Sequence, residues 1–371
     1  MTLSRRRLLL AGACLPAFSL LACSPRTPAM TPEEAQFVQK LTARMRTRCI
    51  GRHLIDLPED FVLNPVDRVE IEGVEVSIRP LSRAGFDYQL ERRTEELKVE
   101  TIHGEKTLSL REVRQLPDGR GIVYDRSKTG ANPAIRTWEL RAWLDGYQLV
   151  MTTESYDKSL SKRPLAELKT DVEEKYTHLL NVYGRLRGRR DDEIPSEPGD
   201  CFAHGLWTGA QAEAAEFYVN YHLKDAPDVY IHLRSVSGDG DVARPDTGLI
   251  QRRRQIEQQI KHSGSELLRL QQRMIHGKTY EESAAREPDQ VTSARVPGHS
   301  AVLQTDQSVE GRSAPFFKML MFNGHYIPSP PRSLEEKAKI PDLTRATLSE
   351  GQVLALWEAI TATLRPRPGA L

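Results

Sequence analysis

The hydrophobic and polar positions of the 371-residue chain form two similar series of predicted elements. Alternating apolar and polar residues predict a half-buried strand at Val74–Ile78 and a second at Val229–Leu233. A charged helical stretch follows each strand, at Leu90–Lys98 and at Ile250–Arg273. Strands and helices mixed in this way, without regular βαβ alternation, indicate an α+β fold rather than a parallel sheet.

An amphipathic helix is predicted at the end of each series, because apolar residues recur there at steps of three and four. The first helix carries Leu165, Leu168, Val172, Tyr176 and Leu179. The second helix carries Val353, Trp357, Ile360 and Leu364, and Ser349 is placed to cap its N-terminus.

Turn signals extend the comparison between the two series. Asp145-Gly146 and Asn323-Gly324 each predict a tight hairpin, because both residue types tolerate a positive φ. Pro117–Val123 resembles Pro297–Val302, and on this alignment the second series has extra residues, which we place in a long helix from Ile250 to about Glu282. We interpret the two series as a duplication; the alternative is a coincidence between two generic α+β domains.

A charged stretch that contains Pro and Gly, Arg185–Asp200, separates the two series and is typical of a linker. We therefore predict two similar tandem domains, residues 44–186 and residues 201–367, joined by a linker over residues 187–200. Each domain is expected to be a mainly antiparallel sheet with flanking helices.

The N-terminus has the order of regions that is typical of a secretory signal peptide, which we place at residues 1–22. Three arginines at positions 5–7 precede the apolar run Leu8–Ala22, which is too short to span a bilayer. Leu20-Leu21-Ala22-Cys23 resembles a bacterial lipobox, so Cys23 is predicted to be lipidated. Cys14 lacks the bulky residue that should precede it. An ordinary signal peptide with a chance cysteine is the alternative.

Lipidation at Cys23 would hold the mature chain at a membrane, because a diacylglycerol with a second acyl chain anchors firmly without a helix. Ser24 rather than Asp follows the cysteine, which favours the outer membrane of a Gram-negative cell. The predicted location is therefore the periplasm, with residues 23–43 as a tether. Ser4–Leu9 also resembles a twin-arginine signal, so two export routes stay open.

Charge and composition narrow the function classes. The chain has 52 Lys and Arg against 51 Asp and Glu, a net charge of +1, which excludes a strongly basic nucleic-acid binder. Removal of the signal takes away three arginines and brings the net charge to −2. Four cysteines are too few for a disulfide scaffold, and 39% hydrophobic residues suffice for packed cores.

Cys49 and Cys201 are a candidate disulfide. They are the cysteines that remain in the mature chain beside Cys23, and two such cysteines in an oxidising periplasm pair more often than not. A bridge across so long a segment would restrict the unfolded chain by about 4–5 kcal/mol. Two buried free thiols are the alternative.

The sequence has no recognisable catalytic, metal or cofactor site. Gly298–Val302 begins like the Gly-x-Ser-x-Gly nucleophile elbow, but Val302 replaces the second glycine, so Ser300 is not expected to be a nucleophile. The ten histidines form no His-Glu-x-x-His pair, and there is neither a Cys-x-x-Cys motif nor a Walker-type loop. His53, His204 and His232 are interpreted as ordinary surface or core residues.

Paired charges along the chain favour solvated helix faces over a reactive site. The paired acids are Glu95-Glu96, Glu173-Glu174 and Glu281-Glu282. The basic stretches Arg187–Arg190 and Arg252–Arg254 suit helix faces or contacts with an acidic partner.

The openings of the two domains resemble a known family. Cys49-Ile-Gly-Arg-His-Leu-Ile-Asp-Leu-Pro-Glu-Asp-Phe resembles the start of the N-terminal domain of the type VI lipase immunity family. Cys201-Phe-Ala-His-Gly-Leu-Trp is similar to the start of that family's C-terminal domain. These proteins inhibit the fourth class of type VI secreted phospholipase effectors, and the resemblance covers about residues 44–367.

The resemblance implies a periplasmic inhibitor and not an enzyme. The implied partner is the cognate phospholipase effector, an α/β-hydrolase whose lid region is held closed by two domains arranged as a clamp. The inhibitor is expected to be a monomer before binding, with no cofactor, no metal and no nucleic acid. A bridge between Cys49 and Cys201 would fix the two domain openings. The alternatives are an envelope lipoprotein hydrolase and a solute-binding lipoprotein.

Overall fold

The computed structural model describes residues 28–64, 69–102, 107–127, 132–161, 169–238, 248–288, 297–311, 314–325 and 343–370. The predicted signal peptide at residues 1–22, the lipidation site Cys23, and Leu165 and Leu168 of the first amphipathic helix lie outside these residues. Within them, no helix combines the length and the apolar character needed to cross a membrane.

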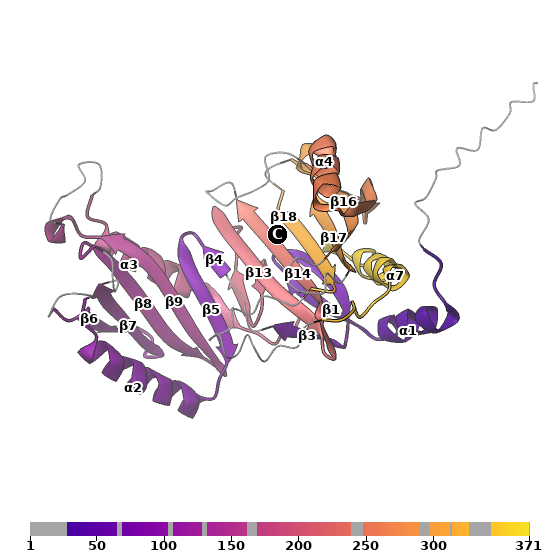
Figure 1. The fold of residues 1–371 in the computed structure, drawn as a ribbon. Coiled ribbons are helices and arrows are strands. Elements are labelled where there is room, and N and C mark those ends of the chain that lie inside the picture. The colour runs from indigo at the N-terminus through magenta and orange to yellow at the C-terminus, as the bar shows by residue number, and fades with distance from the viewer. Residues whose placement is uncertain are drawn as a thin grey trace, which may run out of the picture.

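A long antiparallel sheet runs through the molecule (Figure 1) and has 13 strands in the described ranges. Its N-terminal half contains β4 (Val69–Ile71), β5 (Val74–Pro80), β6 (Leu110–Gln115), β7 (Gly121–Ser127), β8 (Ile135–Leu144) and β9 (Tyr147–Tyr156). Its C-terminal half contains β13 (Ala214–Leu223), β14 (Ala226–Gly238), β15 (Glu266–Ile275), β16 (Lys278–Pro288), β17 (Pro297–Thr305) and β18 (Phe316–Asn323). Strand β3 (Phe61–Asn64) pairs with β13 beside β4.

The two halves of this sheet have the same topology. Starting from the middle, the strand order is β4-β5-β9-β8-β7-β6 in one direction and β13-β14-β18-β17-β16-β15 in the other. Strands β4 and β13 pair antiparallel where the halves meet. Two tandem α+β units built largely from antiparallel strands are therefore confirmed, and they share one continuous sheet.

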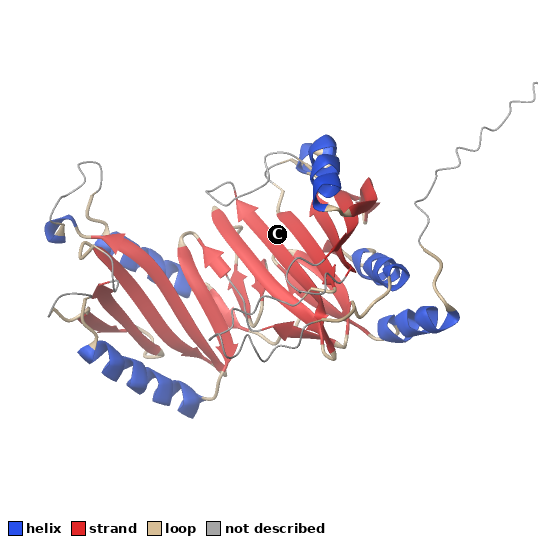
Figure 2. Ribbon diagram, in the orientation of Figure 1, coloured by secondary structure: helices blue, strands red, loops and turns tan. Residues whose placement is uncertain are grey.

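Helices cover both faces of the sheet (Figures 1 and 2). The helices of the described ranges are α1 (Pro32–Thr42), α2 (Arg83–Val99), α3 (Val172–Tyr183), α4 (Arg253–Ser263), the short α5 (Gln307–Glu310) and α7 (Glu350–Thr361), and a 3₁₀ turn lies at Lys158–Leu160. The capping box that Ser349 forms at the start of α7 confirms the predicted cap.

Adjacent strand residues show which helix lies on which face, because successive side chains point to opposite faces. Helix α2 binds Glu139 through Arg93, whereas the indole of Trp138 donates to the first residue of α3, Val172. In the other half, the segment before α4 donates two N–H groups to Glu281, and Trp357 of α7 donates to Glu282. We call the face under α2 and α4 the outer face, and the face under α3 and α7 the core face.

Two small three-stranded sheets exchange their last strands between the halves. In the first, β1 (Met45–Ile50) and β2 (His53–Pro58) of the N-terminal half pair with β19 (Arg365–Pro366). In the second, β11 (Gly199–Phe202) and β12 (Gly205–Thr208) of the C-terminal half pair with β10 (Leu186–Gly188). Each half of the chain therefore completes the opening hairpin of the other.

The long helix predicted from Ile250 to about Glu282 is wrong. Helix α4 ends at Ser263, where Gly264 adopts a left-handed conformation with φ 76°. Residues Glu266–Ile275, which overlap the predicted Ile250–Arg273 helix, form β15. Cross-strand ion pairing holds the charged residues of this segment in a strand, as between Arg269 and Glu282.

One of the two predicted hairpins is confirmed. Asp145 and Gly146 have φ of 45° and 102° and join β8 to β9. The hairpin at Asn323-Gly324 is wrong, because β18 ends at Asn323 and lies between β14 and β17, which both precede it in the chain. The Asn323 side chain exchanges hydrogen bonds with Leu348. The predicted match of Pro117–Val123 to Pro297–Val302 is also wrong. The first segment contains the β6–β7 turn, whereas the second begins β17, the strand that corresponds to β8.

Parts of the predicted linker and tether are ordered structure. The linker over residues 187–200 contains the end of β10 and the start of β11, and Arg189 within it is 1% exposed. The tether over residues 23–43 contains α1, which has a capping box at Thr31 and buries Val38 and Leu41. Helix α1 lies against α7, so the segment that could serve as a tether ends before Pro32.

Candidate functional site

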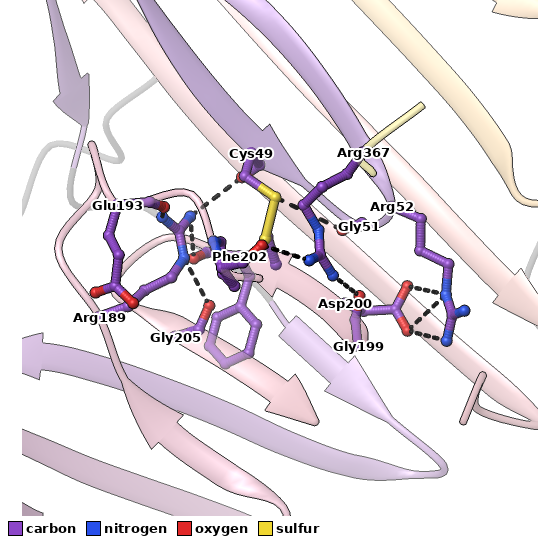
Figure 3. Close-up of a disulfide and its surroundings, with 12 residues drawn as sticks. Cys49, Gly51, Arg52, Arg189, Glu193, Gly199, Asp200, Phe202, Gly205 and Arg367 are labelled. Carbon is purple, nitrogen blue, oxygen red and sulfur yellow. Dashed lines mark hydrogen bonds and ion pairs between the residues drawn. A yellow bond between two sulfur atoms is a disulfide. The ribbon is translucent and has the colours of Figure 1, made fainter. Parts of the chain in front are cut away.

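The two exchanged sheets meet at a disulfide between Cys49 of β1 and Cys201 of β11 (Figure 3), with an S–S distance of 2.07 Å. Both cysteines are buried. The Gly51 N–H donates to the Cys201 carbonyl at 2.7 Å, and the Cys201 N–H donates to the Gly51 carbonyl at 2.8 Å. One covalent bond and two backbone hydrogen bonds therefore join the opening hairpins of the two halves.

Gly51 is required by this close approach. Its φ is 52°, in the left-handed region that favours glycine. A Cβ at this position would lie 2.0 Å from the Ser235 Oγ on β14. The turn between β1 and β2 therefore packs directly onto the long sheet.

Arg189 is the centre of the crossing between β10 and the second hairpin (Figure 3). Its guanidinium donates to the backbone carbonyls of Gly205, Arg190, Asp191, Glu193, Cys49 and Phe202. Burial lowers the pKa of Arg189, and the charge of Asp191 opposes that effect. Arg189 thus binds carbonyls from both halves with its planar set of donors.

Arg367 has the equivalent position after β19. It donates to the carbonyls of Pro195 at 2.8 Å, Glu197 at 2.9 Å and Gly199 at 2.6 Å. Neither arginine is among the residues predicted to be functional, although the sequence contains a signal for both. Leu186-Arg-Gly-Arg189 and Leu364-Arg-Pro-Arg367 each follow the last helix of a half, so a Leu-Arg-x-Arg repeat marks both exchanged strands.

A buried ion pair completes the junction. Arg52 lies 3.2 Å from Asp200, whose side chain is 0% exposed, and it also donates to the Ala370 carbonyl at 2.7 Å. The Ser237 hydroxyl donates to Asp200 at 3.0 Å. Burial raises the pKa of Asp200, while the charge and hydrogen bonds of Arg52 act against it. The carboxylate is thereby held between β11, the β1–β2 turn and β14.

A small cavity of about 140 Å³ lies beside the junction. His53, Lys278, Tyr280 and Glu310 contribute to its walls, and Lys278 is paired with Glu310 at 2.7 Å. Burial, with a smaller contribution from the charge of Lys278, lowers the pKa of His53 to about 4. His53 is therefore a neutral core residue at neutral pH, as interpreted from the sequence.

The structure places Ser300 within β17, where a nucleophile elbow is not possible. Its cross-strand neighbours on the same face are Phe322 and Ala285, neither of which carries a base. His299 points to the other face and contacts Asn323. In the ranges that the structure describes, no group of three or more His, Cys, Asp or Glu side chains is placed to hold a metal ion.

The paired acids fall into two classes. Glu95-Glu96 on α2 and Glu173-Glu174 on α3 are exposed, as predicted for solvated helix faces. Glu281 and Glu282 are buried on β16 instead, so the helix-face prediction is wrong for them. Glu282 accepts hydrogen bonds from Arg269 and Trp357, which ties α7 to the core face.

The basic stretch Arg187–Arg190 is not a free patch. Arg189 is buried, Arg187 pairs with Glu193 and Glu197, and Arg190 pairs with Asp192. These contacts lie within the predicted linker. The site as a whole is a rigid junction that fixes the two halves relative to each other.

Two family models match the chain. Residues 46–189 match the model described as "Tle cognate immunity protein 4 N-terminal domain". Residues 193–369 match the model described as "Tle cognate immunity protein 4 C-terminal domain". No curated protein matches the chain.

Solved structures share the fold at low sequence identity. One is described as "Apo structure of immunity protein TplEi of T6SS from Pseudomonas aeruginosa"; it is 19% identical, covers 87% of this chain and 97% of its own, and has a TM-score of 0.62. Another is described as "The crystal structure of Tle4-Tli4 complex"; it is 19% identical, covers 88% of this chain and 99% of its own, and has a TM-score of 0.64. Both likenesses concern the fold.

Proposed function

Since the chain belongs to the Tle cognate immunity protein 4 family, we propose that it binds and inhibits a cognate lipase effector of a type VI secretion system. The observation that carries this proposal is the match of both domain models, in order, over residues 46–189 and 193–369. The fold shared with the structure described as a Tle4-Tli4 complex supports a role in binding an effector.

The proposed mechanism is a shift in the population of lipase conformations. A lipase with a mobile lid over its serine must open the lid at a lipid surface. An inhibitor that binds the closed form stabilises that form by its differential affinity for the two states. We propose that the two halves grip the lid region as a clamp and hold it closed.

The buried junction supports a preorganised clamp. The disulfide, the Arg189 cluster, the hydrogen bond from the Arg367 N–H to the Arg52 carbonyl and the Arg52–Asp200 pair all connect the two halves. Because their relative placement is fixed before binding, little ordering of the inhibitor accompanies association. Two surfaces held on one rigid body also act as linked contacts, which raises avidity when both can engage.

Complex formation tests the proposed function. We would mix the mature chain with the lipase encoded beside its gene and separate the mixture by size-exclusion chromatography. The proposal predicts co-elution at one to one, and no co-elution with a lipase of another effector class. Separate elution from the neighbouring lipase would overturn it.

Anchoring at Cys23 is a further part of the proposal, because the lipobox lies directly before a polar, Pro-bearing segment. Cys23→Ala should move the protein from the membrane fraction of the envelope to the soluble fraction, because the acyl chains provide the anchor. The measurement is fractionation followed by immunodetection. An unchanged membrane fraction would contradict lipidation at Cys23.

A further inference from the structure

The central strands of the outer face are bare of helix in the part of the chain that the structure describes. Helices α2 and α4 lie towards the two ends of the long sheet (Figure 1). In the C-terminal half, the outward side chains of β13, β14 and β18 are half-buried, whereas the residues between them are buried on the core face. A sheet face with this pattern offers a flat surface that another protein can contact.

The register of the strands places these side chains in three neighbouring rows. The rows are Tyr218–Arg234–Lys318, Asn220–His232–Leu320 and His222–Tyr230–Phe322. We call this grid of nine residues the outer-face patch.

The outer-face patch is rich in rings that contact one another. The rings of Tyr230 and Phe322 stack with centroids 4.7 Å apart, and those of Tyr218 and His232 are 5.1 Å apart. Arg234 lies over the Tyr218 ring at 5.6 Å. Aromatic residues and arginine are the types that contribute most to the energy of protein interfaces. Aromatic rings bury large area with little loss of conformational freedom, and arginine presents a planar set of hydrogen-bond donors.

Lys318 is an uncompensated cation within the outer-face patch. It lies directly across from Arg234, and like charges in this position destabilise a sheet. Arg234 pairs with Glu216, but Lys318 has no hydrogen bond or ion pair to any residue that the structure describes. Burial lowers the pKa of Lys318, and the charges of Arg234 and Arg252 lower it further.

The polar side chains of Gln304 and His232, next to Lys318, do not compensate its charge. Gln304, its partner on β17, donates its side-chain N–H to Glu281 instead. Burial, together with the charges of Lys318 and Arg234, lowers the pKa of His232 to about 4, so that this ring is neutral at neutral pH. Its Nδ1 lies 2.5 Å from the Asn220 side-chain oxygen, which can only accept a hydrogen bond.

We propose that the outer-face patch is a docking surface for the cognate lipase, with a carboxylate of the lipase on Lys318 and an apolar side chain against Tyr230 and Phe322. This inference rests on the proposed function. A half-buried cation opposite another cation destabilises the free protein, and only an anionic partner converts it into an attraction. The stacked rings, which lie two rows away in the same patch, would supply the apolar part of the same contact.

Lys318→Met and Lys318→Glu test the proposal, with binding of the purified lipase measured by biolayer interferometry and Tm measured for each free variant. We expect Lys318→Met to weaken binding about tenfold or more, and Lys318→Glu to weaken it further. The Tm of Lys318→Met should not fall, because the substitution removes a repulsion. A fall in Tm would itself overturn the account of Lys318 as uncompensated.

Lys175→Met is the matched control, because Lys175 is a half-exposed lysine on α3, which lies on the core face. It should leave the affinity for the lipase unchanged.

If wild-type protein does not bind the lipase, the proposed function fails. If wild type and Lys318→Met bind equally well, the function stands and the docking surface is overturned. A second measurement is binding of wild-type protein and of Lys318→Met to vesicles that contain phosphatidylglycerol. Vesicle binding that is lost in Lys318→Met would assign the patch to a membrane and overturn the proposal.

Discussion

At the scale of single residues, the junction is stabilised by side chains that donate hydrogen bonds to backbone carbonyls. Arg189 saturates its donors with carbonyls from both halves, whereas Arg367 binds the carbonyls of Pro195, Glu197 and Gly199. A buried carbonyl that loses its donor costs free energy because water cannot replace the hydrogen bond. These two arginines should therefore matter for stability more than the exposed arginines around them.

Arg189→Met should lower the free energy of unfolding by about 3 kcal/mol or more, because it leaves several buried carbonyls without donors. Urea denaturation followed by circular dichroism measures the effect. Arg190→Met is the control, since the Arg190 side chain is exposed and pairs with Asp192 on the surface, and it should cost no more than about 0.5 kcal/mol. Equal stability of the two variants would show that the arginine cluster is not a structural centre.

Gly51→Ala should destabilise the protein by about 3 kcal/mol, since it combines a strained φ with an overlap against Ser235. Gly73→Ala separates these two causes. Gly73 has φ 78°, but nothing lies within 4 Å of a Cβ built there, so this variant should cost only about 1 kcal/mol. Thermal unfolding of both variants gives the comparison, and the prediction fails if Gly51→Ala is the milder change.

Glu139 should make stability depend on acid pH. Burial alone would raise its pKa, but hydrogen bonds and charges from Arg93 and Arg141 outweigh burial and lower the pKa from 4.5 to about 2. Ionised Glu139 therefore contributes about 3 kcal/mol to the free energy of unfolding; this contribution is complete above pH 4.5 and is lost as the pH falls towards 2. Urea midpoints between pH 6 and pH 3 should fall less steeply in Glu139→Gln than in wild type. Exposed Glu95→Gln should follow wild type; parallel curves for all three would refute the assignment.

At the scale of elements, the exchange of β10 and β19 makes each half depend on the other. Strand β19 pairs with β2 through Arg365 and Leu54, and the Arg367 N–H then donates to the Arg52 carbonyl at 2.8 Å. These contacts connect the last residues of the chain to its first hairpin. A change at the C-terminus should therefore alter the local stability of the N-terminal half.

Deletion of residues 365–371 should increase amide hydrogen exchange in β2 and around Cys49, because it removes the edge strand and the Arg367 cluster. Hydrogen–deuterium exchange with mass spectrometry would follow peptides from both halves. Strands β7 and β8, at the far end of the sheet, serve as the internal control and should stay protected. Unchanged exchange in β2 would show that the exchanged strand is not needed there.

The elements also show where sequence patterns are informative. Period-two alternation located β5 and β14, and Ser349 located the start of α7, because burial on one face sets both patterns locally. The charged β15 was mistaken for a helix, because its strand conformation depends on pairing with β16. The pairing of β19 with β2 joins residues far apart in the sequence, Arg365 and Leu54, so only the repeated Leu-Arg-x-Arg pattern could have indicated it. Alternation likewise predicts a sheet face but not whether a helix covers it.

At the scale of the whole molecule, the two halves form one body rather than two jaws on a flexible linker. The continuous sheet, the disulfide and the exchanged strands all cross between them. A clamp built in this way binds by complementary shape and charge without closing around its partner. Expression of residues 24–200 or 201–371 alone should therefore abolish binding, because each fragment lacks a strand that the other supplies.

Inhibition of the cognate lipase in solution tests the central claim most directly. The lipase would be held at a fixed concentration above the dissociation constant, and hydrolysis of a phospholipid in micelles would be followed while the mature chain is added. The account predicts that activity falls linearly and reaches zero at one equivalent of the chain. Full lipase activity in the presence of several equivalents would contradict it.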